Sequence, residues 1–86
     1  MGVDPVEAGI ATLAGKRSGV RYRDLRAILT AAGAAEVSRN GSHRTWKHPD
    51  VAALLTLVDG PGDVLAVYIK MTRKYLEAIL ASRHSA

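Results

Sequence analysis

The sequence predicts an α+β fold, a two-layer sandwich in which two helices cover one face of a three-stranded antiparallel sheet. Three observations lead to this expectation. Apolar residues recur at helical spacing before Gly33, alternate with polar residues between 35 and 58, and return to helical spacing after the Gly- and Pro-containing turn at 59–62. The chain has 86 residues and no cysteine, so one small core has to stabilise it without a disulfide.

A first helix is expected in the stretch DPVEAGIATLAG, residues 4–15. Asp4 suits the N-cap position before a proline at the first helical residue, and Glu7 stands at capping-box spacing from it. Three apolar residues share one face at helical spacing: Val6, Ile10 and Leu13. Gly15 ends the helix, and the stretch GKRSG that follows reads as a mobile basic linker.

A second helix is expected to begin at about Tyr22 and to end at Gly33. Its apolar face consists of Tyr22, Leu25, Ile28, Leu29 and Ala32. Arg23 and Arg26 lie off that face. The helix therefore packs on one side and presents positive charge on the other.

Two short antiparallel strands are expected at 35–39 and 44–48, joined by the turn Asn40-Gly41-Ser42-His43. The dipeptide Asn-Gly is a strong hairpin signal, because both residues tolerate the backbone conformation of tight turns. Residues 51–58, with the sequence VAALLTLV, form a third strand. This strand is more apolar than the other two, so we expect it to be better covered.

Strand alternation divides the side chains of the second strand between two faces. His43 and His48 are five residues apart, so strict alternation places them on opposite faces. We expect His48, which precedes a proline, to be a structural residue at the strand end. Trp46 is expected in the core, toward the helices. The other face of the sheet is available for a ligand or partner.

A final helix is expected within the stretch DVLAVYIKMTRKYLEAILASR, residues 63–83. Its start stays open, because residues 64–68 fit an extended segment equally well. The side chains of Ile69, Leu76 and Leu80 are expected to face the sheet. A polar stripe on the other side consists of Lys70, Arg73, Lys74 and Glu77.

Positive charge is unevenly distributed along the chain. Twelve Lys and Arg against eight Asp and Glu give a formal charge of +4, and the cations cluster at 16–26, around the predicted turn and at 70–74. Such clusters attract polyanions in a salt-dependent manner, although solvated surface charge is an equally open reading. No apolar run approaches the length of a membrane span and the first residues lack a signal peptide, so we expect a cytoplasmic protein without a membrane partner.

Several segments resemble the HicA toxin family: YRDLRAILTAAG, SRNGSHRTWKHP, and a basic C-terminal helix with KMTR that follows a strand and a Gly-rich turn. The resemblance covers roughly residues 16–80 and implies a double-stranded-RNA-binding-like α-β-β-β-α fold with an additional N-terminal helix. We therefore divide the chain into an N-terminal helical extension, residues 1–15, and a HicA-like domain, residues 16–86. The resemblance further implies an endoribonuclease toxin that cleaves mRNA independently of the ribosome, and a HicB-like antitoxin protein as its partner.

Carried over residue by residue, the family's catalytic histidine falls on His43 and its turn glycine on Gly41. Lys70 and Arg73 match a basic pair of the later helix. Several positions depart from the family pattern. Arg44 and Trp46 stand where His or an apolar residue and Phe or Tyr are common, which is a conservative difference. Ala34 stands where the family has Phe, which lowers apolar burial, and DGPGDV at 59–64 replaces a Pro-Arg-His segment, so a second family contact to RNA or antitoxin has no counterpart here.

The chemistry of RNA cleavage fits what one histidine can do. RNA carries its own nucleophile, the 2′-hydroxyl, so cleavage needs a base for its proton, cationic stabilisation of the phosphorane and a donor for the leaving oxygen. Histidine has an ordinary pKa of about 6.5, which suits proton transfer near neutral pH. His43 is thus the candidate general base of a metal-independent reaction that needs no cofactor. The nearby candidates for phosphate contact are Arg39, Ser42, Arg44 and Lys47.

A second function class stays open, a non-catalytic RNA-binding or protein-binding module on the same fold. In either class the helical cations are candidate RNA contacts: Arg23, Arg26, Lys70, Arg73 and Lys74. In the non-catalytic role, His43 only completes the turn. The intact Gly41-Ser42-His43 favours the nuclease, whereas the departures at Ala34 and after the third strand favour the binding module.

Overall fold

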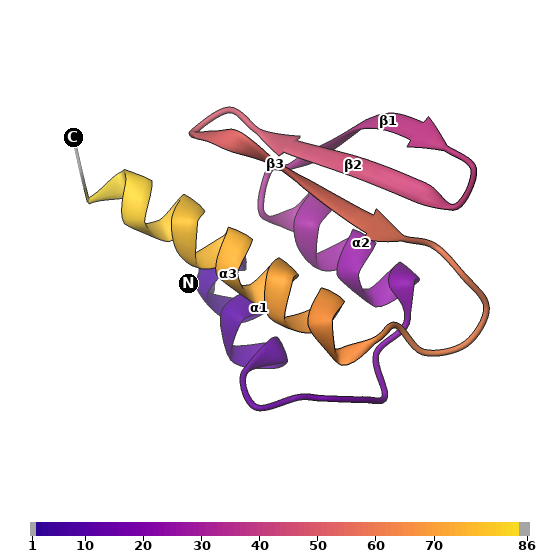
Figure 1. The fold of residues 1–86 in the computed structure, drawn as a ribbon. Helices are drawn as coiled ribbons and strands as arrows, with labels where there is room; N and C mark the ends of the chain where they lie inside the picture. Colours follow the sequence, from indigo (N-terminus) through magenta and orange to yellow (C-terminus); the bar gives the residue numbers. More distant parts are fainter. Residues whose placement is uncertain (1, 85–86) are drawn as a thin grey trace.

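The computed structural model describes residues 2–84 as three helices and a three-stranded antiparallel sheet. In chain order the elements are α1 (Pro5–Leu13), α2 (Tyr22–Ala31), β1 (Ala35–Asn40), β2 (His43–His48), β3 (Val51–Val58) and α3 (Ala66–Arg83) (Figure 1). The α+β class predicted from the sequence is confirmed, with the order α-α-β-β-β-α.

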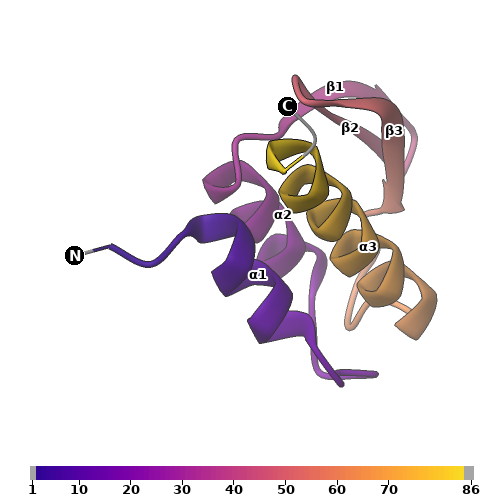
Figure 2. The same cartoon turned by 90° about the vertical axis from the view of Figure 1, so that its left-hand side faces the viewer.

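The helices form two layers beside the sheet, so the predicted two-layer sandwich gains a third layer (Figure 2). As predicted, α2 and α3 cover one face of the sheet, and α1 lies on the far side of these two helices. Val6 and Leu13 of α1 are buried in the same hydrophobic cluster as Leu25 of α2 and Leu57 of β3. The N-terminal helix is therefore docked, and its core is continuous with that of the following residues.

The close approach of α1 to the other helices depends on Gly9. A Cβ atom at this position would lie 2.7 Å from Cγ2 of Ile28 and 3.0 Å from Cδ1 of Leu76. Leu76 therefore points toward α1, which corrects the expectation that it faces the sheet. On the sheet side of α3 stands Tyr75, whose hydroxyl reaches the backbone of β2 and β3.

Helix boundaries follow the local signals in the sequence. Oδ1 of Asp4 accepts a hydrogen bond from the N–H of Val6 at 3.1 Å, and Gly33 ends α2 with a φ of +93°. α3 begins at Ala66 after an extended Leu65, so only the first two residues of the open stretch 64–68 lie outside the helix. There the N–H of Val64 donates to the carbonyl of Val20 at 2.8 Å, so the end of the linker is fastened to the segment that leads into α3.

The sheet has the order β1-β2-β3, and its pairing is irregular between Glu36 and Ser38 and again between Trp46 and His48. At the second irregularity, residues 52–54 of β3 lie opposite residue 47 of β2. The hydroxyl of Tyr75 accepts a hydrogen bond from the N–H of His48 at 3.0 Å and donates one to the carbonyl oxygen of residue 53 at 2.9 Å. One phenol thus satisfies two backbone groups that the interrupted ladder leaves without partners.

β3 has the predicted bounds, but it is an edge strand and is less covered than expected. Leu55 and Leu57 are buried under the helices, whereas Leu54 is 57% exposed, and Ala52 and Ala53 are exposed as well. An apolar strand is covered only where another element lies on it, and an edge strand in this sheet has helices on one face alone.

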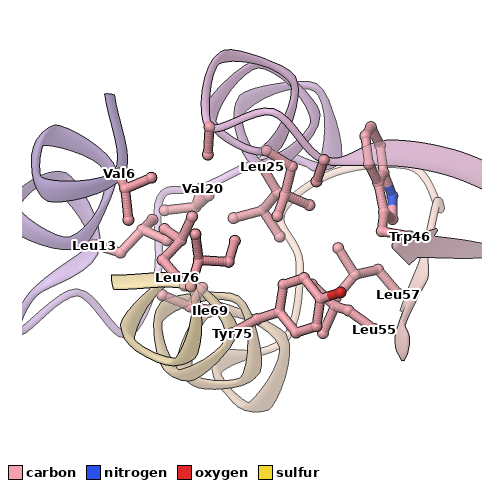
Figure 3. Close-up of a cluster of buried hydrophobic side chains, with 14 of the residues drawn as sticks. Val6, Leu13, Val20, Leu25, Trp46, Leu55, Leu57, Ile69, Tyr75 and Leu76 are labelled. Atoms are coloured by element: carbon pink, nitrogen blue, oxygen red, sulfur yellow. The ribbon is translucent and has the colours of Figure 1, made fainter. Parts of the chain in front are cut away.

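The core runs from α1 through α2 and α3 to the sheet (Figure 3). Trp46 lies at the sheet end and is 3% exposed, so its predicted place in the core is confirmed, while Val6 and Leu13 lie at the α1 end. Ala34, at the position where the resemblance expects Phe, is buried in the same cluster. Within residues 2–84, no helix combines the length and hydrophobicity that a membrane span requires.

Candidate functional site

The turn between β1 and β2 contains two residues, Gly41 and Ser42, because Asn40 and His43 already pair as strand residues. Gly41 has a φ of +59°, while the φ of Ser42 is not positive. This is the sign pattern of a type II′ turn, which suits the twist of a hairpin. The carbonyl of Ser42 accepts a hydrogen bond from the N–H of Asp59 at 2.7 Å, so the turn is also fastened to the end of β3.

His43 is exposed on the outer face of the sheet, the face without helices. Its neighbour Arg44 pairs with the buried Leu57 on the inner face, so strand alternation directs His43, Thr45 and Lys47 outward. Across residues 2–84, the imidazole of His43 makes no side-chain hydrogen bond or ion pair. An accessible imidazole and the exposed ammonium group of Lys47 therefore share the outer face of β2.

Arg44 lies on the inner face and holds the turn. Its Nη1 donates to the carbonyl of Gly41 at 2.6 Å and to that of His43 at 3.2 Å. Nη2 lies 3.4 Å from Oδ2 of Asp59, and the buried Nε lies 3.5 Å from Oε1 of Glu36, an ion pair without hydrogen-bond geometry. The side chain is 14% exposed. The structure therefore does not bring this guanidinium to the face that carries His43.

Glu36 is the centre of a polar cluster beneath the hairpin. Its Oε2 accepts a hydrogen bond from Nε of Arg39 at 2.9 Å, and this bond together with the carboxylate charge raises the pKa of Arg39. The hydroxyl of Tyr22 accepts from Nε1 of Trp46 at 3.2 Å and lies 3.5 Å from Oε1 of Glu36. Burial raises the pKa of Tyr22, which outweighs the lowering by the Trp46 hydrogen bond. Arg39 is exposed, but a carboxylate already engages it.

His48 is buried at the other end of β2, and both its ring nitrogens are engaged. Nδ1 accepts a hydrogen bond from the N–H of Asp50 at 3.0 Å, so Nε2 carries the proton and donates to the carbonyl of Ala32 at 3.1 Å. The ring thereby joins the end of α2 to the connection between β2 and β3. The prediction that His48 and His43 lie on opposite faces is confirmed.

The other cations predicted to contact RNA belong to the helical layers. The exposed ones are Arg23 and Arg26 on α2 and Lys70 and Lys74 on α3, and Arg73 is half-buried. α2 and α3 cover the inner face of the sheet, whereas His43 and Lys47 project from the outer face. The structure does not bring the helical cations and His43 to one face, so an RNA strand in contact with both would have to pass around the sheet.

The partners of Arg44 were not among the residues singled out from the sequence. The sequence did contain one indication that Arg44 needs such partners. Arg44 is two residues from Trp46 in the same strand, so alternation places it on the core face to which the sequence assigns Trp46. A guanidinium on that face requires an acceptor, which Glu36 and Asp59 supply. Neither position is recognisable from spacing, since the partners come from the two neighbouring strands or their ends.

Among the described residues, 2–84, no group of three or more His, Cys, Asp or Glu side chains is placed to hold a metal ion. No family model, curated protein or solved structure matches the chain. The resemblance to the HicA family therefore depends on the segments quoted above.

Proposed function

We propose that this chain is an endoribonuclease toxin of the HicA/HicB type, which cleaves mRNA with His43 as the general base. The observation that carries the proposal is the accessible imidazole of His43 beside a turn whose carbonyls are held by Arg44. A general base has to reach the substrate and to keep its position, and this site favours both. The resemblance of the GSH segment to the family supplies the substrate class.

The proposed reaction uses the nucleophile that RNA itself carries. His43 takes the proton of a 2′-hydroxyl as the 2′ oxygen bonds to the adjacent phosphorus and the bond to the 5′ oxygen breaks. A solvent water donates the proton that completes the 5′-hydroxyl end, the hydroxide so formed takes the proton back from His43, and the other fragment keeps a 2′,3′-cyclic phosphate. The exposed hydroxyl of Ser42, which precedes His43, and the exposed ammonium group of Lys47, farther along the same face of β2, are the candidate contacts to the phosphates of the strand. Arg44 contributes by holding the turn.

The first experiment compares wild type, His43→Ala and His84→Ala after induced expression in a bacterial host. His84 is a matched control because it is also exposed and lies at the end of α3, far from the turn in sequence. Wild type and His84→Ala are expected to stop growth and to fragment mRNA. His43→Ala should lower cleavage by about 10²- to 10⁴-fold, the range for loss of a general base.

A second experiment measures cleavage by the purified protein on two RNA substrates that differ only in the nucleotide at the cleaved position. A 2′-deoxy nucleotide at the cleaved position should abolish cleavage there, because the nucleophile is missing. Since residue 43 is exposed, His43→Ala should keep the wild-type circular dichroism spectrum and unfold within about 2 °C of wild type. The proposal fails if a folded His43→Ala protein cleaves like wild type, or if wild type leaves mRNA intact.

A non-catalytic RNA-binding module is the second candidate. The pairing of Arg39 and Arg44 with carboxylates favours it, because the sequence predicted both as cations free to bind phosphate near His43. In this case wild type binds RNA without cleaving it, and Arg23→Gln with Arg26→Gln on α2 weakens binding. The growth and mRNA experiment separates the two candidates directly.

The toxin proposal also requires a partner and a compartment. A HicB-like antitoxin is expected to bind over His43 or over the basic surface and to suppress cleavage, and both proteins act in the cytoplasm, where mRNA is available. A gene for a small acidic protein beside the gene of this chain would supply the candidate. Its co-expression should restore growth.

A further inference from the structure

A cavity of about 550 Å³ opens between the end of α1, the linker that follows it and the first half of α3. Its lining residues fall within 13–17 and 66–73, so no strand contributes to it. The N-terminal helix, which lies outside the region of resemblance, forms part of one wall. The cavity is therefore a feature of this chain's own helical layers and is separate from the sheet face that carries His43.

Four cations line the cavity, Lys16 and Arg17 from the linker and Lys70 and Arg73 from α3. No carboxylate is among the lining residues. None of the four cations forms an ion pair with any residue in the described range 2–84, in contrast to the arginines Arg39, Arg44 and Arg83. Positive charge is thus concentrated and uncompensated in this cavity, which favours an anionic occupant.

The remaining lining is mostly apolar. Leu13 and Ile69 belong to the core beneath the cavity, and Val67 at its edge is 52% exposed. The first turn of α3 contains no acidic residue and Leu65 provides no side-chain cap, so the positive end of the helix dipole adds to the charge of the side chains. The volume lies within the range of about 300–1,000 Å³ that is typical of small-ligand sites.

We propose that this cavity binds a nucleotide unit through its phosphate, outside the His43 site; the choice of RNA as the source of that nucleotide rests on the proposed function. Two guanidinium groups and two ammonium groups match the oxygens of a phosphate, which guanidinium groups bind in a bidentate manner. The apolar lining accommodates the ribose or base. An acidic peptide would satisfy the cations but would leave this apolar lining in water.

Binding is tested on the full chain with a fluorescently labelled 2′-O-methyl oligoribonucleotide, which has no free 2′-hydroxyl and stays uncut. The cavity variants Lys16→Gln and Arg17→Gln are compared with Arg21→Gln, a matched control that removes an exposed cation outside the cavity lining. Each cavity variant should weaken binding by about fivefold, the upper range for an exposed ion pair. A plot of the logarithm of the binding constant against the logarithm of the salt concentration should become less steep by about 0.7 in each variant. This is the value for the loss of one contact to a single-stranded phosphate. Arg21→Gln should leave both quantities unchanged, and an equal loss in all three variants would overturn the site.

Nuclear magnetic resonance locates the contact. With the same oligonucleotide, the amide resonances of Gly15, Ala66 and Val67 are expected to shift. Shifts with a nucleoside 5′-monophosphate as well would show that a free nucleotide is a sufficient source, whereas shifts with the oligonucleotide alone would identify the strand as the source. Equal shifts with polyglutamate would show that the cavity recognises charge alone, which contradicts the nucleotide proposal, as would unchanged resonances with every probe.

Cleavage assays on the same variants separate this inference from the proposed function. In one outcome, cleavage depends on His43 and the cavity variants bind RNA like wild type. This outcome supports the proposed nuclease and contradicts the proposed nucleotide site in the cavity. In the opposite outcome, the cavity variants lose nucleotide binding but the wild-type chain does not cleave RNA. This outcome supports the nucleotide site and contradicts the proposed nuclease.

Discussion

The two histidines of β2 occupy opposite ends of one strand and have opposite surroundings. His43 is exposed on the outer face and makes no side-chain bond with residues 2–84, whereas His48 is 5% exposed and both its ring nitrogens are hydrogen-bonded. His43 is therefore available for chemistry, and His48 connects α2 to the sheet. Both residues are histidines of the same strand, so the face of the sheet from which each side chain projects accounts for the difference in their surroundings.

The largest expected effect on stability is that of His48→Ala. The substitution removes the ring and leaves the carbonyl of Ala32 and the N–H of Asp50 without their partner. The free energy of unfolding should fall by about 2–4 kcal/mol, from the lost hydrogen bonds and the cavity together. Urea titration measures it, with His43→Ala as the matched variant expected within about 0.5 kcal/mol of wild type. Equal losses in the two variants would break the comparison.

A second test compares Arg44→Met with Lys47→Met, one on each face of β2. Arg44→Met leaves Asp59 without its cation, leaves Glu36 with Arg39 alone and releases the turn carbonyls, so we expect a loss of about 1–2 kcal/mol in the free energy of unfolding. Lys47 is exposed, and Lys47→Met should change the free energy of unfolding by less than about 0.5 kcal/mol. Lys47→Met should instead weaken RNA cleavage. A larger loss of stability in Lys47→Met would contradict the assignment of faces.

A third and smaller effect concerns Tyr22, beneath the hairpin. Because burial raises its pKa, the folded chain holds the phenol proton more tightly than the unfolded chain does. This contribution to stability is complete below the unfolded pKa of about 10 and is lost as pH rises through the folded pKa. Wild type should therefore lose stability above about pH 10, and Tyr22→Phe should lack this part of the pH dependence.

At neutral pH, Tyr22→Phe should be less stable than wild type by about 0.5–1.5 kcal/mol, because Nε1 of Trp46 loses its acceptor. Urea titrations at pH 7 and pH 10.5 measure both effects. Tyr68→Phe is the control, since the Tyr68 hydroxyl makes no hydrogen bond within residues 2–84. Identical results for the two variants would mean that the Tyr22 hydroxyl contributes nothing specific.

Features that depend on neighbouring residues were predictable from the sequence. Asp4 caps α1, Gly33 ends α2, and β3 spans the predicted residues, because each of these boundaries depends on local backbone preferences. Strand parity correctly separated His43 from His48 and placed Trp46 in the core. These predictions needed no knowledge of tertiary contacts.

Features that depend on distant contacts were not predictable. The edge position of β3 follows from the strand order, and the direction of Leu76 follows from the docking of α1 at Gly9. Spacing within β2 suggested that Arg44 and Lys47 both serve the site, but only the neighbouring strands reveal which of them is already bound by carboxylates. Likewise, the basic cavity joins residues of the linker to residues of α3 that no local pattern relates.

The docking of α1 on α3 has a consequence for the order of events during synthesis. Val6 and Leu13 are buried against an element that the ribosome makes after the whole sheet, and the Asp4–Arg83 ion pair joins these same two helices. Contacts of such long sequence separation require closure of a long loop, and during synthesis they cannot form before α3 has been made. A nascent chain that stalls before α3 therefore exposes the apolar face of its first helix and presents the hairpin without its supporting core, a state that chaperones and proteases recognise.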